Sequence, residues 1–306
     1  QRLAAFHAMA QGKVRLIAAT AEGLLQRTLP PEELEVHVVT VEASGSYSLD
    51  ELADRLAALG YTRCQQVEGV GQFALRGGIL DVFSPGMEAP VRVEFFGDEV
   101  DAMGRFDLAT QRRTENIETA LLLPAAEVLP RLAPGSLAGL AKEIGKLAAR
   151  ALQNGNRELN KTLEQDGEAV AQGRSFPAVD RYLPLIYPEL TSAADFLPPD
   201  ACVIFDQAAR SSDRAKSYQW QLEEDVKTLL EQGELDPSCG ELAHTFPQLL
   251  RRLEDFPVVY LDSFTTSNYP APPRELLSVT AKQLPPFLAS LETAVQDLAH
   301  YQNSGF

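Results

Sequence analysis

The segment from Gln72 to Phe106 constrains the fold most, because β-branched and aromatic residues fill it between turn signals. The dipeptides Pro85-Gly86 and Gly97-Asp98 are both typical of turns. The second stands as a two-residue loop between two apolar runs, which is the pattern of a tight β-hairpin. The segment therefore predicts an antiparallel sheet.

A two-residue loop at Gly97-Asp98 would fix the pairing of this hairpin. The expected pairs are Phe96 with Glu99, Phe95 with Val100, Glu94 with Asp101, Val93 with Ala102 and Arg92 with Met103. Side chains alternate across a strand, so one face of the hairpin is apolar and is expected to meet the core. Its members are Val91, Val93, Phe95, Val100 and Ala102. The opposite face carries Arg92, Glu94, Phe96, Glu99 and Asp101.

Phe96 is a large aromatic residue on a face otherwise made of charged side chains. Either another part of the domain covers it, as is usual for aromatic residues, or it is an exposed anchor for a partner. Aromatic residues and arginine are enriched at interface hot spots, and Arg92 shares this face. Spacing alone leaves both alternatives open. Glu94 opposite Asp101 is an unfavourable like-charge pair, which Arg92, Arg105 or a basic partner would relieve.

Hydrophobic periodicity predicts further elements on both sides of this sheet. Ser48 begins a helix in a capping box with Glu51, and Gly60 ends it. Other helices are expected at 2–11, 22–27, 137–152, 157–172, 213–232 and 288–301, with Pro30-Pro31 ending the second of these. Strands are expected at 36–41 and, as buried strands, at 14–19, 201–206 and 257–262, and a linker at 270–273. The mixture indicates an α/β chain.

Three segments resemble nucleotide-binding motifs, but each lacks a residue or a spacing that its motif requires. The glycines of the segment from Gly139 to Lys146 are too far apart for a phosphate-binding loop, and Leu147 replaces the Ser or Thr that binds magnesium. Gly69-Val70-Gly71 lacks the third glycine of a dinucleotide fingerprint. Asp206 ends a strand as a magnesium-binding acid would, but Gln207 follows it where a glutamate would orient water.

The remaining chemistry-bearing residues are scattered. The four histidines lie at His7, His37, His244 and His300, and the three cysteines at Cys64, Cys202 and Cys239. None has a nucleophile, base or metal ligand at a useful spacing. We therefore expect no catalytic residue, no cofactor and no metal site, and the chain is not expected to be an enzyme. Widely separated cysteines are expected to be reduced, which favours the cytoplasm.

Length and charge narrow the class of protein further. The 306 residues predict two or three domains, and the net charge of −16 opposes tight binding to nucleic acid. No apolar run approaches the ~18 residues that a membrane helix needs. Because the sequence begins with Gln1 and not Met, we expect it to be cut from a longer protein.

Three motifs resemble the N-terminal, UvrB-like module of the bacterial transcription-repair coupling factor family (Mfd). Residues Gly71–Phe83 resemble its G-E-F-x-x-R-G-G-I-L-D-I-F stretch, and Val91–Val100 resemble R-I-E-F-F-G-D-E-I. Phe106–Arg112 resemble F-D-x-x-T-Q-R. Flanking matches at 24–27, 176–177, 182–185 and 197–206 extend the similarity over nearly the whole chain. UvrB shares these motifs in a looser form.

The resemblance implies truncated, degenerate helicase-like (RecA-like) lobes that an inserted α+β UvrA-binding domain interrupts. Residues 1–33 would end the first lobe, 34–116 would form the inserted domain with its antiparallel sheet, and 117–270 would form the second lobe. Residues 271–306 would be a linker and a helix toward the next domain.

The resemblance also implies a function, which is to recruit UvrA to RNA polymerase stalled at DNA damage, for nucleotide excision repair. RNA polymerase and DNA would be bound only by regions outside this sequence, and the full-length protein would be an ATP-dependent DNA translocase. Carried over by position, the UvrA-binding residues are Arg76, Arg92 and Phe96. The alternative is a UvrB-type, ATP-dependent damage-binding helicase module, against which Gln207 and the acidic charge both speak.

Overall fold

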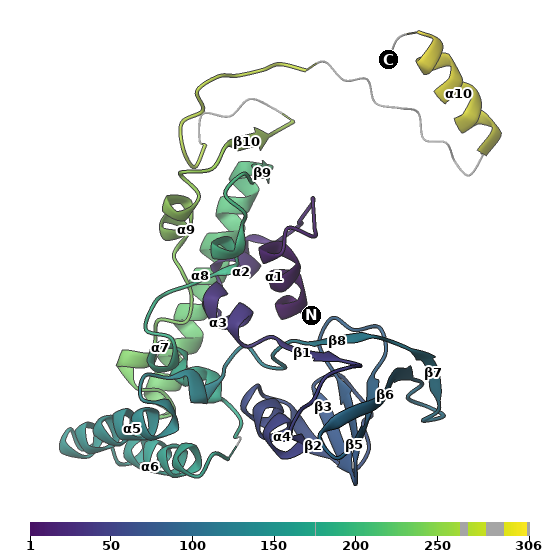
Figure 1. Cartoon of the computed structure of the whole chain (residues 1–306). Coiled ribbons are helices and arrows are strands. Elements are labelled where there is room, and N and C mark those ends of the chain that lie inside the picture. Colours follow the sequence, from purple (N-terminus) through teal and green to yellow (C-terminus); the bar gives the residue numbers. More distant parts are fainter. Residues whose placement is uncertain (175, 264–268, 280–290, 305–306) are drawn as a thin grey trace. The chain divides into compact units, whose positions relative to one another are not determined.

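The computed structural model describes residues 1–174, 176–263, 269–279 and 291–304. The chain divides into two compact units, residues 1–270 and 271–306. The first unit contains both the predicted antiparallel sheet and the helical region that follows it (Figure 1).

The first unit contains a six-stranded sheet with strand order β2-β3-β4-β5-β6-β7. Its strands are β2 (Thr62–Cys64), β3 (Gln72–Arg76), β4 (Ile79–Phe83), β5 (Val91–Phe96), β6 (Glu99–Phe106) and β7 (Arg113–Asn116). Neighbouring strands run antiparallel except β2 and β3, which are parallel. The sequence prediction of an antiparallel sheet is therefore confirmed for most of its pairs.

One face of this sheet packs against α4 (Leu49–Ala58) and against the two-stranded ribbon of β1 (Val39–Glu42) and β8 (Thr119–Leu122). Ser48 caps α4 by accepting a hydrogen bond from the Glu51 amide, as the capping signal predicts. The buried side chains of this core include Leu56, Leu80, Val82, Val91, Val93 and Met103.

A β-bulge changes the register expected for the hairpin of β5 and β6. The pairs next to the turn are as predicted, Phe96 with Glu99 and Phe95 with Val100. Beyond them Glu94 lies opposite Ala102, so Asp101 is the extra residue of the bulge, and Val93 and Arg92 pair with Met103 and Gly104. Three of the five expected pairs are thus wrong, because a hairpin register holds only until a residue is inserted.

The bulge also changes which residues of β6 reach the core. Met103, not Ala102, joins Val100 in the core, and Glu94 has no acidic residue directly opposite it. Alternation along β5 is unbroken, because the extra residue lies on β6. Arg92, Glu94 and Phe96 therefore share the face of β5 that points away from the core, as expected.

The opposite face of the sheet carries a small second core of Val67, Ala74, Phe83 and Phe106. Val67 belongs to the segment between β2 and β3, which folds over this face. Phe106 is fully buried there. The outward face is therefore not simply a solvated surface.

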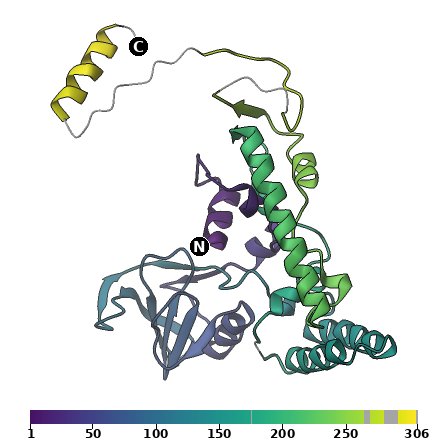
Figure 2. The same ribbon diagram turned by 180° about the vertical axis from the view of Figure 1, so that it is seen from behind.

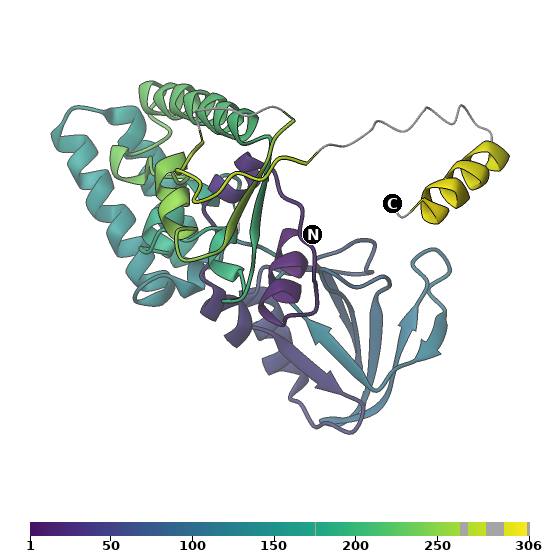
Figure 3. The same cartoon turned by 90° about the horizontal axis from the view of Figure 1, so that it is seen from above.

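Helices form the rest of the first unit. They are α1 (Arg2–Ala10), α2 (Ala21–Leu25), α3 (Pro31–Val36), α5 (Ser136–Gln153), α6 (Arg157–Ala171), α7 (Leu183–Ile186), α8 (Ala208–Glu231) and α9 (Phe246–Arg252). The 3-10 turns are η1 (Pro130–Leu132), η2 (Val179–Tyr182), η3 (Ala193–Phe196) and η4 (Pro237–Cys239). Helices α5 and α6 pack side by side, and α8 runs from β9 toward them (Figures 2 and 3).

Strands β9 (Val203–Asp206) and β10 (Val258–Leu261) form a parallel pair, and both follow the sequence prediction in position. They are not buried as expected. Phe205 packs into a core with α8 and α9, whereas Ile204, Val259 and Leu261 on the other face are exposed. The reason is that no further strand or helix covers that face in the part of the chain that the structure describes.

One prediction near the N-terminus is wrong. Residues 14–19 are not a buried strand but an irregular segment in which Leu16 is 86% exposed, because no strand of the described ranges pairs with it. The helix predicted at 22–27 forms as α2 and ends at Leu25, ahead of Pro30-Pro31. Pro31 begins the next short helix, α3, where its fixed φ and missing amide suit the first turn.

The second unit contains α10 (Leu291–Asn303). The first residues of the helix predicted at 288–301 lie outside the described residues. Within the described part of the chain, no helix has the length and apolar character needed to cross a membrane.

Candidate protein-interaction site

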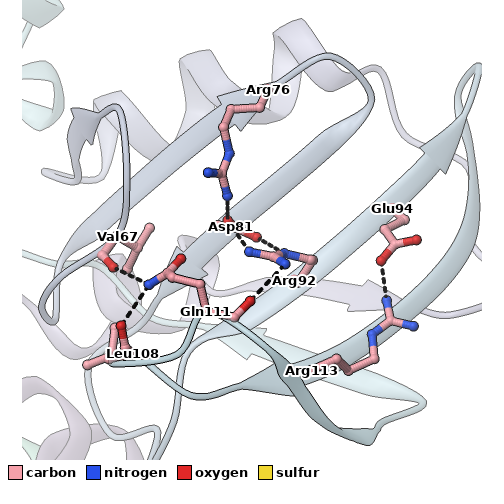
Figure 4. A network of polar contacts seen from close by, with 8 residues as sticks. All are labelled: Val67, Arg76, Asp81, Arg92, Glu94, Leu108, Gln111 and Arg113. Atoms are coloured by element: carbon pink, nitrogen blue, oxygen red, sulfur yellow. Dashed lines mark hydrogen bonds and ion pairs between the residues drawn. The ribbon is translucent and has the colours of Figure 1, made fainter.

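The side chain of Asp81, on β4, is the centre of a polar network on the outward face of the sheet (Figure 4). Its carboxylate is completely buried and accepts hydrogen bonds from two arginines, Arg76 and Arg92. A buried carboxylate needs such partners, because desolvation would otherwise be too costly. The network is therefore a requirement of the fold as well as a surface feature.

Arg92 is held on three sides. Its Nε and Nη2 atoms donate to the two carboxylate oxygens of Asp81 at 2.7 and 2.9 Å, and its Nη1 donates to the carbonyl of Gln111 at 3.2 Å. The guanidinium lies over the Phe106 ring, 4.8 Å from its centroid, in a cation–π contact. The hydrogen bonds to Asp81 raise the pKa of Arg92, although burial opposes this. Only 17% of the side chain is exposed, so Arg92 lies on the outward face but is not freely exposed there.

Arg76 is the more accessible of the two arginines. It is the last residue of β3, and one Nη2 hydrogen bond to Asp81 leaves 46% of its side chain exposed. The following Gly77-Gly78 pair makes a tight turn between β3 and β4, with Gly77 at a φ of +60°. A Cβ added to Gly78 would lie 2.8 Å from the carbonyl oxygen of Phe95, so glycine lets β5 approach this turn closely.

Phe96 is exposed at the tip of the β5–β6 hairpin, with 82% of its surface accessible. Gly97 supplies the positive φ of +64° that the hairpin turn requires. Of the two alternatives from the sequence, the exposed one is therefore correct for the described residues. Phe95 points to the opposite face and packs, half-buried, against the main core.

Two further ion pairs join strands of the same sheet. Glu94 pairs with Arg113 of β7 at 2.7 Å, and Arg105 pairs with Glu115 at the same distance. The like-charge conflict expected at Glu94 is thus absent. Arg113, which the sequence reasoning did not consider, neutralises Glu94 instead of Arg105.

Sequence reasoning missed three members of this face, Asp81, Gln111 and Arg113. Asp81 did have a signal, since it is one acid inside the apolar run from Ile79 to Phe83, and a strand interior rarely buries a carboxylate without a cation. Gln111 had a signal only in the resemblance, as the Gln of the stretch similar to F-D-x-x-T-Q-R, and Arg113 had none. Their positions depend on how the loop between β6 and β7 returns to the sheet.

Two of the segments weighed as nucleotide sites lie in or beside helices. Residues 139–146 lie inside helix α5, so their amides are used within the helix and cannot cradle a phosphate. Gln207 follows Asp206 directly as the N-cap of α8. Throughout the described ranges there is no cluster of His, Cys, Asp or Glu that could hold a metal ion.

Residues 39–127 match the model of the UvrB interaction domain, and they contain the whole six-stranded sheet, α4 and the β1–β8 ribbon.

The whole chain resembles the N-terminal, UvrB-like region of the transcription-repair coupling factors. The factor of Bacillus subtilis is 26% identical over 313 residues, which cover 100% of this chain and 26% of the relative. That of Staphylococcus haemolyticus is 25% identical with the same coverage. That of Haemophilus influenzae is 28% identical over 84% of this chain and 21% of its own length. The chain thus spans about a quarter of the relatives it matches.

Proposed function

We propose that this chain is the non-catalytic part of a transcription-repair coupling factor that recruits UvrA to RNA polymerase stalled at DNA damage. The UvrB interaction domain would bind UvrA directly, and nucleotide excision repair would follow. Contacts with RNA polymerase and DNA, and the ATP-driven motor, would belong to other regions of the longer protein.

The observation that carries this proposal is the exposed Phe96 on the same sheet face as a buried arginine–carboxylate network. Phe96 keeps 82% of its surface exposed, so its ring could be buried in full against a partner. Arginine and aromatic residues together are typical of interface hot spots. The single negative charge of Asp81 neutralises only one of the two arginines. Arg76 uses one of its N–H donors on Asp81, so its other donors are free, within the described part of the chain, to bind an acidic or carbonyl-rich partner surface.

The flanking regions support the architecture in which degenerate helicase-like lobes surround the inserted domain. The parallel pair of β9 and β10, with α8 directly after β9, is the arrangement of an α/β unit. The boundaries proposed from the resemblance, 1–33, 34–116, 117–270 and 271–306, remain part of this proposal.

Retention of UvrA by the immobilised chain tests the proposal, with UvrA taken from the same organism. Specific retention that soluble chain competes away would support it. A chain that retains no more UvrA than blank resin would refute it.

Arg76→Ala is expected to weaken binding of UvrA by about 1.5–3 kcal/mol, the range for a hydrogen bond to a charged group. Stability should change little, because Arg92 still neutralises Asp81 through two hydrogen bonds. Affinity is measured by titration with purified UvrA. Arg214→Ala is the matched control, since Arg214 is an exposed arginine on α8 outside the matched domain. Equal affinity of the two variants would argue against a contact by Arg76.

We also expect no magnesium-dependent ATP hydrolysis by this chain. Residues 139–146 are helical, and the amide of Gln207 cannot act as a base. A phosphate-release assay with damaged duplex DNA present is the measurement. Turnover above that of a no-protein blank would favour a UvrB-type module instead.

A further inference from the structure

Gln111 combines two unfavourable features that a glycine would avoid. Its backbone φ is +59°, a left-handed conformation that side chains with a Cβ rarely adopt. Its side-chain oxygen Oε1 is buried and has no hydrogen-bond partner in the part of the chain that the structure describes. Strain of this kind persists where the surroundings enforce it, and it concentrates at functional sites.

The side chain of Gln111 joins two loops. Its Nε2 donates to the carbonyl of Leu108 at 2.9 Å and to that of Val67 at 3.4 Å (Figure 4). Val67 belongs to the second core with Phe106, so the amide ties the β6–β7 loop to that core. This also fixes the amide orientation, because a flipped amide would place Oε1 against two carbonyl oxygens.

The backbone of Gln111 completes the arrangement. Its amide donates to the carbonyl of Asp107 at 2.7 Å, and the Asp107 carboxylate accepts hydrogen bonds from the amide and hydroxyl of Thr110 at 2.8 Å each. The loop thus presents the Gln111 carbonyl to Arg92, at 3.2 Å from Nη1.

We propose that Gln111 is a positioning residue of the interaction site. Its side chain locks a strained loop so that its carbonyl holds the Arg92 guanidinium flat over Phe106 and bidentate on Asp81. With Arg92 fixed, Asp81 keeps an oxygen directed at Arg76, and the two arginines are presented in one arrangement before the partner arrives. This inference rests on the proposed recruitment of UvrA. Preorganisation of this kind raises affinity by reducing the ordering that binding requires.

Gln111→Gly separates positioning from stability. Glycine removes the side-chain tie, the buried unpaired oxygen and the strain at φ +59° together, so the thermal unfolding midpoint is expected to stay close to wild type. Affinity for UvrA should fall roughly 5–10-fold, which is the size of effect expected when a residue acts through a neighbour in the same hydrogen-bond network. The Arg92 Nε–H signal in NMR should shift and exchange faster with solvent, which a purely structural role of the loop tip would not cause.

Gln207→Gly is the matched control, because Gln207 also has a positive φ, +54°, but lies before α8, outside the matched domain. It should leave UvrA affinity and the Arg92 signal unchanged. Lysine lacks the planar guanidinium that contacts Asp81 and the Gln111 carbonyl at the same time. In an Arg92→Lys background, Gln111→Gly should therefore lower the affinity for UvrA by less than about 2-fold.

Wild-type affinity in Gln111→Gly, or effects of Gln111→Gly and Arg92→Lys that simply add, would overturn the proposal. If the wild-type chain does not bind UvrA, the proposed function fails by itself. The NMR signal then still decides the positioning role, because an unaltered Arg92 Nε–H in Gln111→Gly would refute it and a displaced one would support it.

Discussion

Phe106→Ala is expected to lower the free energy of unfolding of the sheet domain by about 3–5 kcal/mol, as for other fully buried aromatic residues. Phe106 fills the second core together with Val67, Ala74 and Phe83, and 0% of its surface is exposed. Its ring also carries the Arg92 guanidinium at 4.8 Å, so truncation removes both packing and a cation–π contact. UvrA binding should decline as a consequence of this unfolding.

Urea unfolding of the whole chain, read out by hydrogen exchange of the amides of β3 to β6, measures this effect locally. The local readout is needed because a chain with two compact units does not have to unfold in one step. Phe96→Ala is the control in the neighbouring strand and should change stability by less than about 0.5 kcal/mol. A loss below about 1 kcal/mol for Phe106→Ala would contradict the presence of this second core.

Arg92→Ala is expected to destabilise the domain by about 2–4 kcal/mol. Removing one partner of a buried ion pair costs about 3–5 kcal/mol, because the other charge stays buried. Here Arg76 remains on Asp81, which reduces the penalty. Truncation at an exposed surface position would cost under about 0.5 kcal/mol, so the size of the loss distinguishes a buried ion pair from an exposed one.

A charge-neutral double variant tests the cause of this effect. Asp81→Leu combined with Arg92→Met should be more stable than Arg92→Ala alone, because no unpaired buried carboxylate remains. Arg105→Ala, which breaks an exposed pair with Glu115, is the control and should cost less than about 1 kcal/mol. Urea unfolding with the same local readout is the measurement. Equal stability of Arg92→Ala and Arg105→Ala would show that Asp81 does not depend on Arg92.

The elements with strong periodic or capping signals were predictable from sequence. The capped helix after Ser48, the helices of 137–152 and 157–172 and the hairpin at Gly97-Asp98 all form at the expected positions. These signals are local, so neighbouring residues decide them. The exposure of Phe96 was one of two open alternatives, and it follows from its place beside the turn.

The remaining features depend on contacts between distant segments. The bulge at Asp101 has no mark in the sequence, since Val100 and Ala102 both suit a core position. The segment 14–19 has the composition of a strand but no neighbour to pair with among the described residues. The paired arginines of the site follow from one buried acid, Asp81, whose partners come from β3 and β5.

Calorimetric titration of purified UvrA with this chain and with its Phe96→Ala variant tests the recruitment of UvrA most directly. The predicted result is saturable binding that Phe96→Ala weakens by about 2 kcal/mol or more, or roughly 30-fold, with stability unchanged. Trp220→Ala, which removes another exposed aromatic side chain on α8, should bind as tightly as wild type. An affinity of Phe96→Ala equal to that of wild type, or no binding by the wild-type chain, would contradict the proposed recruitment of UvrA through Phe96.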